Sequence, residues 1–250
     1  MPKLVKYIKG IDYYDCTGLV DPGQTIVVNL HPEGVFEIIF QLHSPVWQQQ
    51  NGSGWAVRHD AFIGGLFKGY YQIKITAATR LLCIRFQVGM AKYFIPAPLN
   101  AFTNQLIPYA EIWKDHLSER LAESIDLRSQ LYLIEQALQR WLSVNRRSVI
   151  DQAVAQIVQQ KGVVDISRLA WDAKLSEVQF RKRFREEVGL SPKYFARITK
   201  ANAIAAILSA EENTPLTHLG YRFGYFDQAH FSKDFKSVTG FSPSQYQKGR

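Results

Sequence analysis

The sequence predicts an α+β protein with an all-β N-terminal domain, a helical connector and an all-α C-terminal domain that contains two helix-turn-helix units. Three observations support this prediction. Short β-branched and aromatic runs alternate with turn residues between positions 25 and 86, apolar residues between 127 and 141 follow a helical period, and one motif occurs twice near the C-terminus. We expect the domains to cover residues 1–105, 106–147 and 148–250.

The N-terminal domain is predicted from five runs that are rich in strand-forming residues. These runs are residues 25–28, 35–40, 55–57, 70–75 and 81–86. Turn residues separate them, at positions 22–23, 32–34, 51–54 and 64–65. Many short strands with frequent turns favour a small antiparallel barrel or sandwich.

The connector, residues 106–147, is expected to be helical. Its apolar residues step by 4, 3, 4 and 3, which is the spacing of a coiled-coil seam: Leu127, Leu131, Ile134, Leu138 and Trp141. Two heptads are fewer than a coiled coil normally needs. Two interpretations stay open, namely a seam packed inside its own domain and a contact between two copies of the chain in a homodimer.

The C-terminal prediction is based on a motif that recurs after 51 positions. Its first three members are Phe180, Lys182 and Phe184, which return as Phe231, Lys233 and Phe235. Both copies continue into Gly-x-Ser-Pro, which ends at Pro192 and Pro243. Aromatic residues at i and i+4 share one face of a helix, and the basic residue between them points to the other side. Each copy therefore predicts a helix with a buried aromatic stripe and an exposed cation.

A shorter helix and a tight turn precede each of these basic helices, within residues 169–176 and 219–227. A helix, a tight turn and a basic helix form the arrangement that places a recognition helix in the DNA major groove. In the first turn Lys174 stands where the second turn has Gly224. Such a turn position tends to need a positive φ, which costs a non-glycine residue on the order of 1 kcal/mol.

The second copy closely resembles the signature of the AraC-type bacterial transcription regulators. It reads Leu219-Gly220-x-x-Phe223-Gly224-Tyr225-x-Asp227-Gln228-x-His230-Phe231-Ser232-Lys233 and continues to Gly240-Phe241-Ser242-Pro243. The resemblance covers roughly residues 150–248. It implies a seven-helix DNA-binding domain in which one long helix joins the two units. Ser191 as N-cap and Pro192 as the first helical residue suit the start of that helix. The segment before it resembles the cupin-like sensor halves of the family, which implies a cupin-like barrel.

The resemblance also implies which residues face the DNA. On the first recognition helix these are Glu177, Val178, Arg181 and Lys182, and on the second Gln228, Ala229, Ser232 and Lys233. Arg181 and Lys182 suit guanine O6 and N7, and Gln228 suits adenine. Lys182 and Lys233 stand where the family usually has Arg. Lysine cannot donate the paired hydrogen bonds of a guanidinium group, so these positions are expected to discriminate less between bases.

The charge distribution agrees with a polyanionic partner. The net charge is +8, of which +3 falls on residues 1–147 and +5 on the shorter remainder. A basic run at 181–185 lies on the first recognition helix, where phosphate and base contact explains it better than simple solvation. The predicted function is a DNA-binding transcription regulator, with double-stranded DNA as partner and RNA polymerase as a candidate. The alternative is an interaction module with weak or no autonomous DNA binding.

Several other classes are disfavoured. No apolar run reaches the length of a membrane span and the first residues lack a signal-peptide core, so a cytoplasmic protein without membrane contact is expected. In such a protein Cys16 and Cys83 are expected to be reduced core thiols. No two of the six histidines have the spacing of a cupin metal site, so neither a metal, a cofactor nor an enzyme is expected. His31 and Glu37 are the one pair that could converge.

A small-molecule effector in the barrel is compatible with the sequence, but no residue identifies it. Six aromatic residues could line a pocket, although such residues usually form the core: Trp47, Trp55, Phe62, Tyr70, Tyr71 and Phe86. None is assigned to a ligand site.

Overall fold

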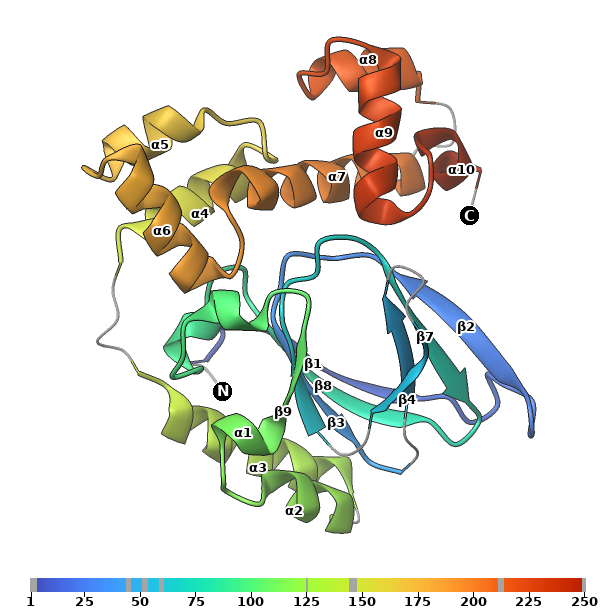
Figure 1. Cartoon of the computed structure of the whole chain (residues 1–250). Coiled ribbons are helices and arrows are strands. Elements are labelled where there is room, and N and C mark those ends of the chain that lie inside the picture. The colour runs from blue at the N-terminus through green and yellow to red at the C-terminus, as the bar shows by residue number, and fades with distance from the viewer. Residues whose placement is uncertain are drawn as a thin grey trace.

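The chain folds into a β-rich N-terminal part, a small group of helices beside it and a larger group of helices above (Figure 1). This is the α+β arrangement that the sequence predicts. The computed structural model describes residues 4–43, 46–50, 54–58, 61–124, 126–143, 148–210 and 214–248.

The N-terminal part contains two antiparallel sheets. The first has the strand order β1 (Ile8–Asp15), β8 (Arg80–Phe86), β3 (Glu37–Gln41), β6 (Ala61–Gly64) and β9 (Leu106–Pro108). The second has the order β2 (Thr25–Leu30), β7 (Tyr71–Thr76), β4 (Val46–Gln50) and β5 (Ala56–Arg58). All five predicted runs overlap strands.

Three details of the sequence prediction are wrong. Gly64 is not in a turn, because it ends β6 and pairs with both Glu37 and Leu106. Residues 106–108 are not helical, because they form β9 and extend the first sheet. Strands β1, β4 and β6 were also missed; β1 pairs with β8, which lies about 70 positions further along the chain. The expected turn at 51–54 falls largely on residues 51–53, which lie outside the described residues.

The first sheet uses its two faces differently, because side chains alternate along a strand. On β3, Ile38 and Phe40 are buried at 0% and 1% exposure and belong to the hydrophobic core. Glu37 and Ile39 point to the other face, where they line a cavity between the two sheets. The same alternation on β8 puts Arg85 on the cavity side. The sheet therefore carries a packed core on one face and a cavity wall on the other.

Two short 3-10 helices precede the connector, η1 (Ala91–Tyr93) and η2 (Leu99–Phe102). After β9 the connector continues as α1 (Tyr109–Ile112), α2 (Leu117–Glu123) and α3 (Leu127–Trp141). Ile134 and Leu138 of α3 are fully buried, and Trp141 stacks on Trp113 with ring centroids 4.3 Å apart. These contacts favour a seam packed inside its own chain. Leu127 does not belong to the buried stripe, because it is 45% exposed.

Seven helices follow among the described residues of the C-terminal part, the number that the family resemblance implies. They are α4 (Ile150–Gln159), α5 (Ile166–Asp172), α6 (Glu177–Val188), α7 (Pro192–Ala210), α8 (Leu216–Arg222), α9 (Gln228–Thr239) and α10 (Pro243–Gln247). Helix α7 begins at Pro192, and the Ser191 hydroxyl accepts the Tyr194 N–H at 3.3 Å, which confirms the predicted cap. We call α5 with α6 the first unit and α8 with α9 the second unit; α7 joins them (Figure 1).

The first unit is bonded to the N-terminal part through a buried cation. Lys92 follows the first sheet, in η1, and is only 5% exposed. Its Nζ lies 2.6 Å from a carboxylate oxygen of Asp151 on α4 and 2.6 Å from one of Glu187 on α6. The Tyr93 hydroxyl donates to Asp151 at 2.6 Å, and the Thr103 hydroxyl donates to the Gly189 carbonyl at the end of α6. These bonds fix α4 and α6 against the N-terminal part.

Candidate nucleic-acid interface

The two recognition helices, α6 and α9, begin and end at residues that stop a helix by local interactions. Ser176 and Gln179 form a reciprocal capping box at the start of α6, and the Asp227 carboxylate accepts the His230 N–H at 2.7 Å at the start of α9. Each helix ends at a glycine with positive φ, Gly189 at 95° and Gly240 at 82°. The repeat thus fixes the length of both recognition helices.

The turn between the helices is built in the same way in both units. The Leu175 N–H bonds to the Ala170 carbonyl at 3.1 Å, and the Tyr225 N–H bonds to the Gly220 carbonyl at 3.0 Å. Lys174 has φ 55° where Gly224 has φ 76°. The predicted positive φ at Lys174 is therefore confirmed, and this residue carries the cost of a left-handed conformation that glycine avoids.

Aromatic side chains fill the core of both units. The four phenylalanines of the repeat are 0% exposed: Phe180, Phe184, Phe231 and Phe235. The Tyr225 hydroxyl donates to Asp234 at 2.7 Å, and Asp234 also forms an ion pair with Arg197 of α7. The second recognition helix is thereby attached to α7 by charge as well as by apolar packing. Sequence reasoning missed Asp234, because the first unit has Arg183 at the corresponding position.

The eight residues predicted to face DNA lie on the solvent side of α6 and α9. Six are exposed, and two are half-buried, namely Glu177 and Ser232. The exposed members are Val178, Arg181, Lys182, Gln228, Ala229 and Lys233. Val178 is 79% exposed. The structure thus places four of the eight predicted DNA-facing residues on α6 and the other four on α9.

Glu177 has bonds within the first unit. Its carboxylate accepts from Arg181 at 2.5 Å and from the Ser167 hydroxyl of α5 at 2.5 Å. Glu177 therefore orients Arg181 and links α5 to α6. Lys182 and Lys233 have no ion pair to any other described residue. These two ammonium groups are free for an external anion.

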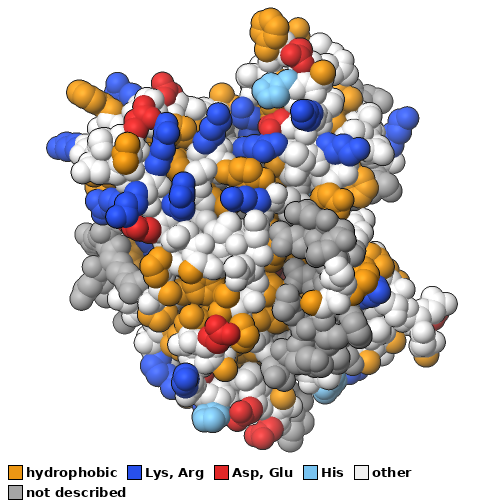
Figure 2. Space-filling model, viewed as in Figure 1, with side chains coloured by type: hydrophobic (Ala, Val, Ile, Leu, Met, Phe, Trp, Pro, Cys, Tyr) orange, Lys and Arg blue, Asp and Glu red, His pale blue; other side chains and the backbone are white. Residues whose placement is uncertain are grey.

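Lys and Arg side chains gather over the helical C-terminal part, whereas the surface below it carries more hydrophobic side chains (Figure 2). Helix α6 carries four exposed cations: Arg181, Lys182, Arg183 and Arg185. Exposed aromatic residues accompany them. Trp171 is 75% exposed at the end of α5 and Tyr221 63% exposed near the end of α8. They were missed, although their spacing of 50 positions matches that of Leu169 and Leu219 in the repeat.

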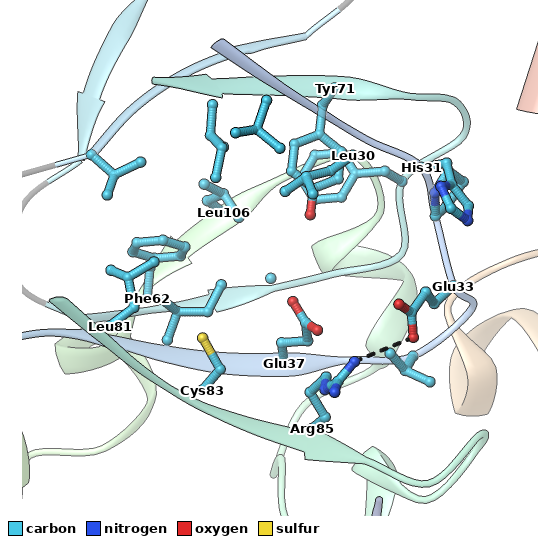
Figure 3. A pocket seen from close by; sticks show the side chains of 18 of the residues that line it. Leu30, His31, Glu33, Glu37, Phe62, Tyr71, Leu81, Cys83, Arg85 and Leu106 are labelled. Carbon is cyan, nitrogen blue, oxygen red and sulfur yellow. Dashed lines mark hydrogen bonds and ion pairs between the residues drawn. The ribbon is translucent and has the colours of Figure 1, made fainter. Parts of the chain in front are cut away.

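A second feature is the cavity between the two sheets, with a volume of about 320 Å³ (Figure 3). His31 and Glu37 both line it, so the pair singled out in the sequence shares one site. Phe62 and Tyr71, two of the six aromatic residues that could line a pocket, also line it. Phe86 does lie in the core, at 0% exposure.

The residues that the structure describes contain no group of three or more His, Cys, Asp or Glu side chains placed to hold a metal ion. Cys16 and Cys83 are both free thiols and both buried. Across the described ranges, no helix is long and apolar enough to cross a membrane.

Comparison with protein families gives two matches. Residues 169–249 match a helix-turn-helix domain family, and residues 2–108 match a domain family of unknown function, DUF6597. The first match covers most of the C-terminal helices, including both recognition helices. The second covers the two sheets and ends with β9.

Related proteins are transcription regulators. The chain is 29% identical to the probable transcriptional regulator LumQ of Photobacterium leiognathi, over 60% of this chain and 61% of LumQ. It is 31% identical to the regulator MtrA of Neisseria gonorrhoeae, over 34% of this chain and 28% of MtrA. It is also 31% identical to the arabinose operon regulatory protein of Escherichia coli, over 34% and 29% of the two chains. The chain thus spans less than two thirds of these relatives.

Among solved structures, fatty-acid-bound ToxT from Vibrio cholerae is similar, with a TM-score of 0.49 and 10% identity over 96% of this chain and 95% of ToxT. The repeated motif lies within the matched helix-turn-helix domain, and the relatives that match are transcription regulators. Residues 169–249 form a helix-turn-helix domain, and the chain is similar to AraC-type transcription regulators such as the arabinose operon regulatory protein.

Proposed function

We propose that this regulator binds specific DNA sequences with α6 and α9, and that a small molecule in the cavity controls this binding. The observation that supports the first part most strongly is the shared geometry of the two units. Each exposes a short recognition helix with an unpaired lysine, and the continuous helix α7 joins them. One chain would then read two successive segments of the major groove.

The exposed side chains suit different parts of DNA. Lys182 and Lys233, without ion pairs to the other described residues, would neutralise phosphates or contact guanine. Arg181, oriented by Glu177, would approach guanine O6 and N7, and Gln228 would pair with adenine. Val178 offers an apolar contact for a thymine methyl group.

Titration against duplex DNA at several salt concentrations tests this function. We expect affinity to fall steeply as salt rises, because bound cations release condensed counterions. A double variant with Lys182→Ala and Lys233→Ala should show a shallower salt dependence, whereas Lys248→Ala, at an exposed position outside the recognition helices, should not. A native protein that binds no DNA would support the interaction module instead.

Control by a small molecule is supported by the loop of residues 31–36, which joins β2 to β3. This loop forms part of the cavity wall through His31, Pro32 and Glu33. Its other side contacts α7, where Asn202 donates an amide hydrogen to the Pro32 carbonyl at 3.1 Å. The same loop therefore contacts both the cavity and the helix that joins the two units. A ligand that moves the loop would change the position of α7.

The Asn202 contact can be removed without touching either the cavity or a recognition helix. We expect Asn202→Ala to change DNA affinity several-fold. Ser209→Ala, at an exposed position on the same helix, serves as the matched control. Equal DNA affinity in the native protein and Asn202→Ala would argue against control through this loop.

A further inference from the structure

The cavity has a charged end with one unpaired carboxylate. Arg85 Nε lies 2.6 Å from Asp12, and its Nη1 lies 3.5 Å from Glu33. Lys9 Nζ lies 2.6 Å from the same Glu33 oxygen. Both cations are thus bound to Asp12 and Glu33. Within the described part of the chain, no hydrogen bond or ion pair to the Glu37 carboxylate is found.

Glu37 points into the cavity, beside Arg85 on the neighbouring strand (Figure 3). Most of the remaining wall is apolar, as shown by Leu30, Phe62 and Leu106. The cavity therefore offers a molecule one acidic end and an apolar body. Its volume of about 320 Å³ is at the small end of the range for ligand pockets.

Burial raises the pKa of Glu37 to about 7, and this rise is opposed by Arg85 and supported by Glu33. The charged form of Glu37 is thus poorly stabilised by the protein alone. The other titratable groups that face it are Lys9, Asp12, Tyr14, His31, Glu33, Tyr71, Cys83 and Arg85. Burial also raises the pKa of Tyr71 and that of Cys83, so both stay neutral and add no negative charge beside Glu37.

We propose that the cavity binds an apolar molecule with a protonated amine, whose ammonium group donates hydrogen bonds to the Glu37 carboxylate. This inference rests on the proposed function and names the chemical class of its effector. An ammonium group supplies the partner that Glu37 lacks, and such charge-assisted bonds are strong where water is excluded. A carboxylate ligand would instead approach Glu37, while Arg85 is already bound to two acids.

Calorimetry with the full chain and three probes of equal chain length, octylamine, 1-octanol and octanoate, tests the head group. At pH 8 we expect octylamine to bind at least about tenfold more tightly than octanol. Octanoate should bind most weakly. Tighter binding of octanol or octanoate than of octylamine, or no binding of octylamine, would overturn the proposal.

The variant Glu37→Gln should lose about tenfold or more of its octylamine affinity while it keeps its octanol affinity. Glu111→Gln, an exposed carboxyl on α1, is the matched control. A melting curve shows whether each variant is folded. Unchanged octylamine affinity in folded Glu37→Gln would contradict the assigned contact.

The pH dependence in the native protein gives a second test that needs no variant. The amine stays protonated, and its binding requires ionised Glu37. Octylamine affinity should therefore rise roughly tenfold per pH unit below pH 7 and level off above pH 8, because Glu37 titrates at about 7 in the empty cavity. Octanol affinity should not follow this curve. An octylamine affinity that is flat from pH 6 to pH 8 would overturn the proposal.

These ligand-binding measurements are made without DNA, so they test the ligand class separately from DNA binding. If octylamine fails to bind and the protein still binds DNA in a salt-dependent way, only the ligand class is wrong. If octylamine binds as expected and no DNA is bound, the proposed function fails and the ligand class stands.

Discussion

The first helix-turn-helix unit is bonded to the N-terminal part by Lys92 and Thr103, whereas the second unit is bonded chiefly to α7 through Asp234. The contacts of the second unit with the N-terminal part are lighter, such as the approach of the Tyr70 ring to Gly240. The cores of the two units are alike, since each buries two phenylalanines of the repeat. The comparison indicates that a repeated sequence fixes the shape of each unit, while unrepeated residues fix where each unit is held.

The largest expected effect tests the shared core. Phe184→Ala and Phe235→Ala should each lower the free energy of unfolding by about 3 to 5 kcal/mol, because each leaves a cavity at a fully buried position. Chemical denaturation measures the loss. Lys233→Ala, on the exposed side of α9, should melt like the native protein. If Phe235→Ala also melted like the native protein, the assignment of helix faces would be wrong.

The second prediction tests the different attachments. Lys92→Met should destabilise the protein by roughly 2 to 4 kcal/mol, because it leaves the Asp151 and Glu187 carboxylates without their shared cation. Hydrogen exchange should then increase in α6 more than in α9. Arg197→Met, which removes the partner of Asp234, should show the reverse order. If both variants showed the same pattern of hydrogen exchange, the two units would not be attached by different contacts.

The third prediction separates the DNA contacts of the two units. Arg181→Ala and Lys182→Ala should each weaken specific binding by about 1 to 3 kcal/mol and relax base preference in one groove segment. Gln228→Ala should do so in the other segment. Footprinting on a selected operator would measure these changes in base preference. The exposed Lys193→Ala is the control, because any effect that it has on affinity should be the same for all DNA sequences. Protection of a single groove segment, unaltered by Gln228→Ala, would exclude reading by both units.

The smallest effect concerns the turn. Lys174→Gly should stabilise the protein by up to about 1 kcal/mol, because glycine adopts the observed φ of 55° without a Cβ clash. The reciprocal Gly224→Lys should destabilise it by a similar amount. Thermal melting of both variants checks the pair. A clear loss of stability in Lys174→Gly would mean that the lysine side chain stabilises its turn.

The DNA-binding half could be predicted from sequence because its elements are defined by local interactions. The aromatic spacing at Phe231 and Phe235, the cap at Ser191 and the glycine at Gly240 act within a few residues of one another. The roles of the eight interface residues stay predictions, since they depend on a bound duplex. In the N-terminal half, strand β9 was missed because three residues form a strand only by pairing with β6.

The sequence by itself thus determined the two units, the long helix between them and the basic character of their exposed faces. Only the tertiary structure decided that Lys92 binds Glu187, which is 95 positions away in the sequence. It also decided that the Glu37 side chain lies in a cavity where Arg85 is already paired with Asp12 and Glu33. Helix periodicity and caps are set by neighbours along the chain, so a sequence displays them. Strand pairing, buried ion pairs and cavities join residues from distant segments, and their partners are chosen by packing of the whole fold.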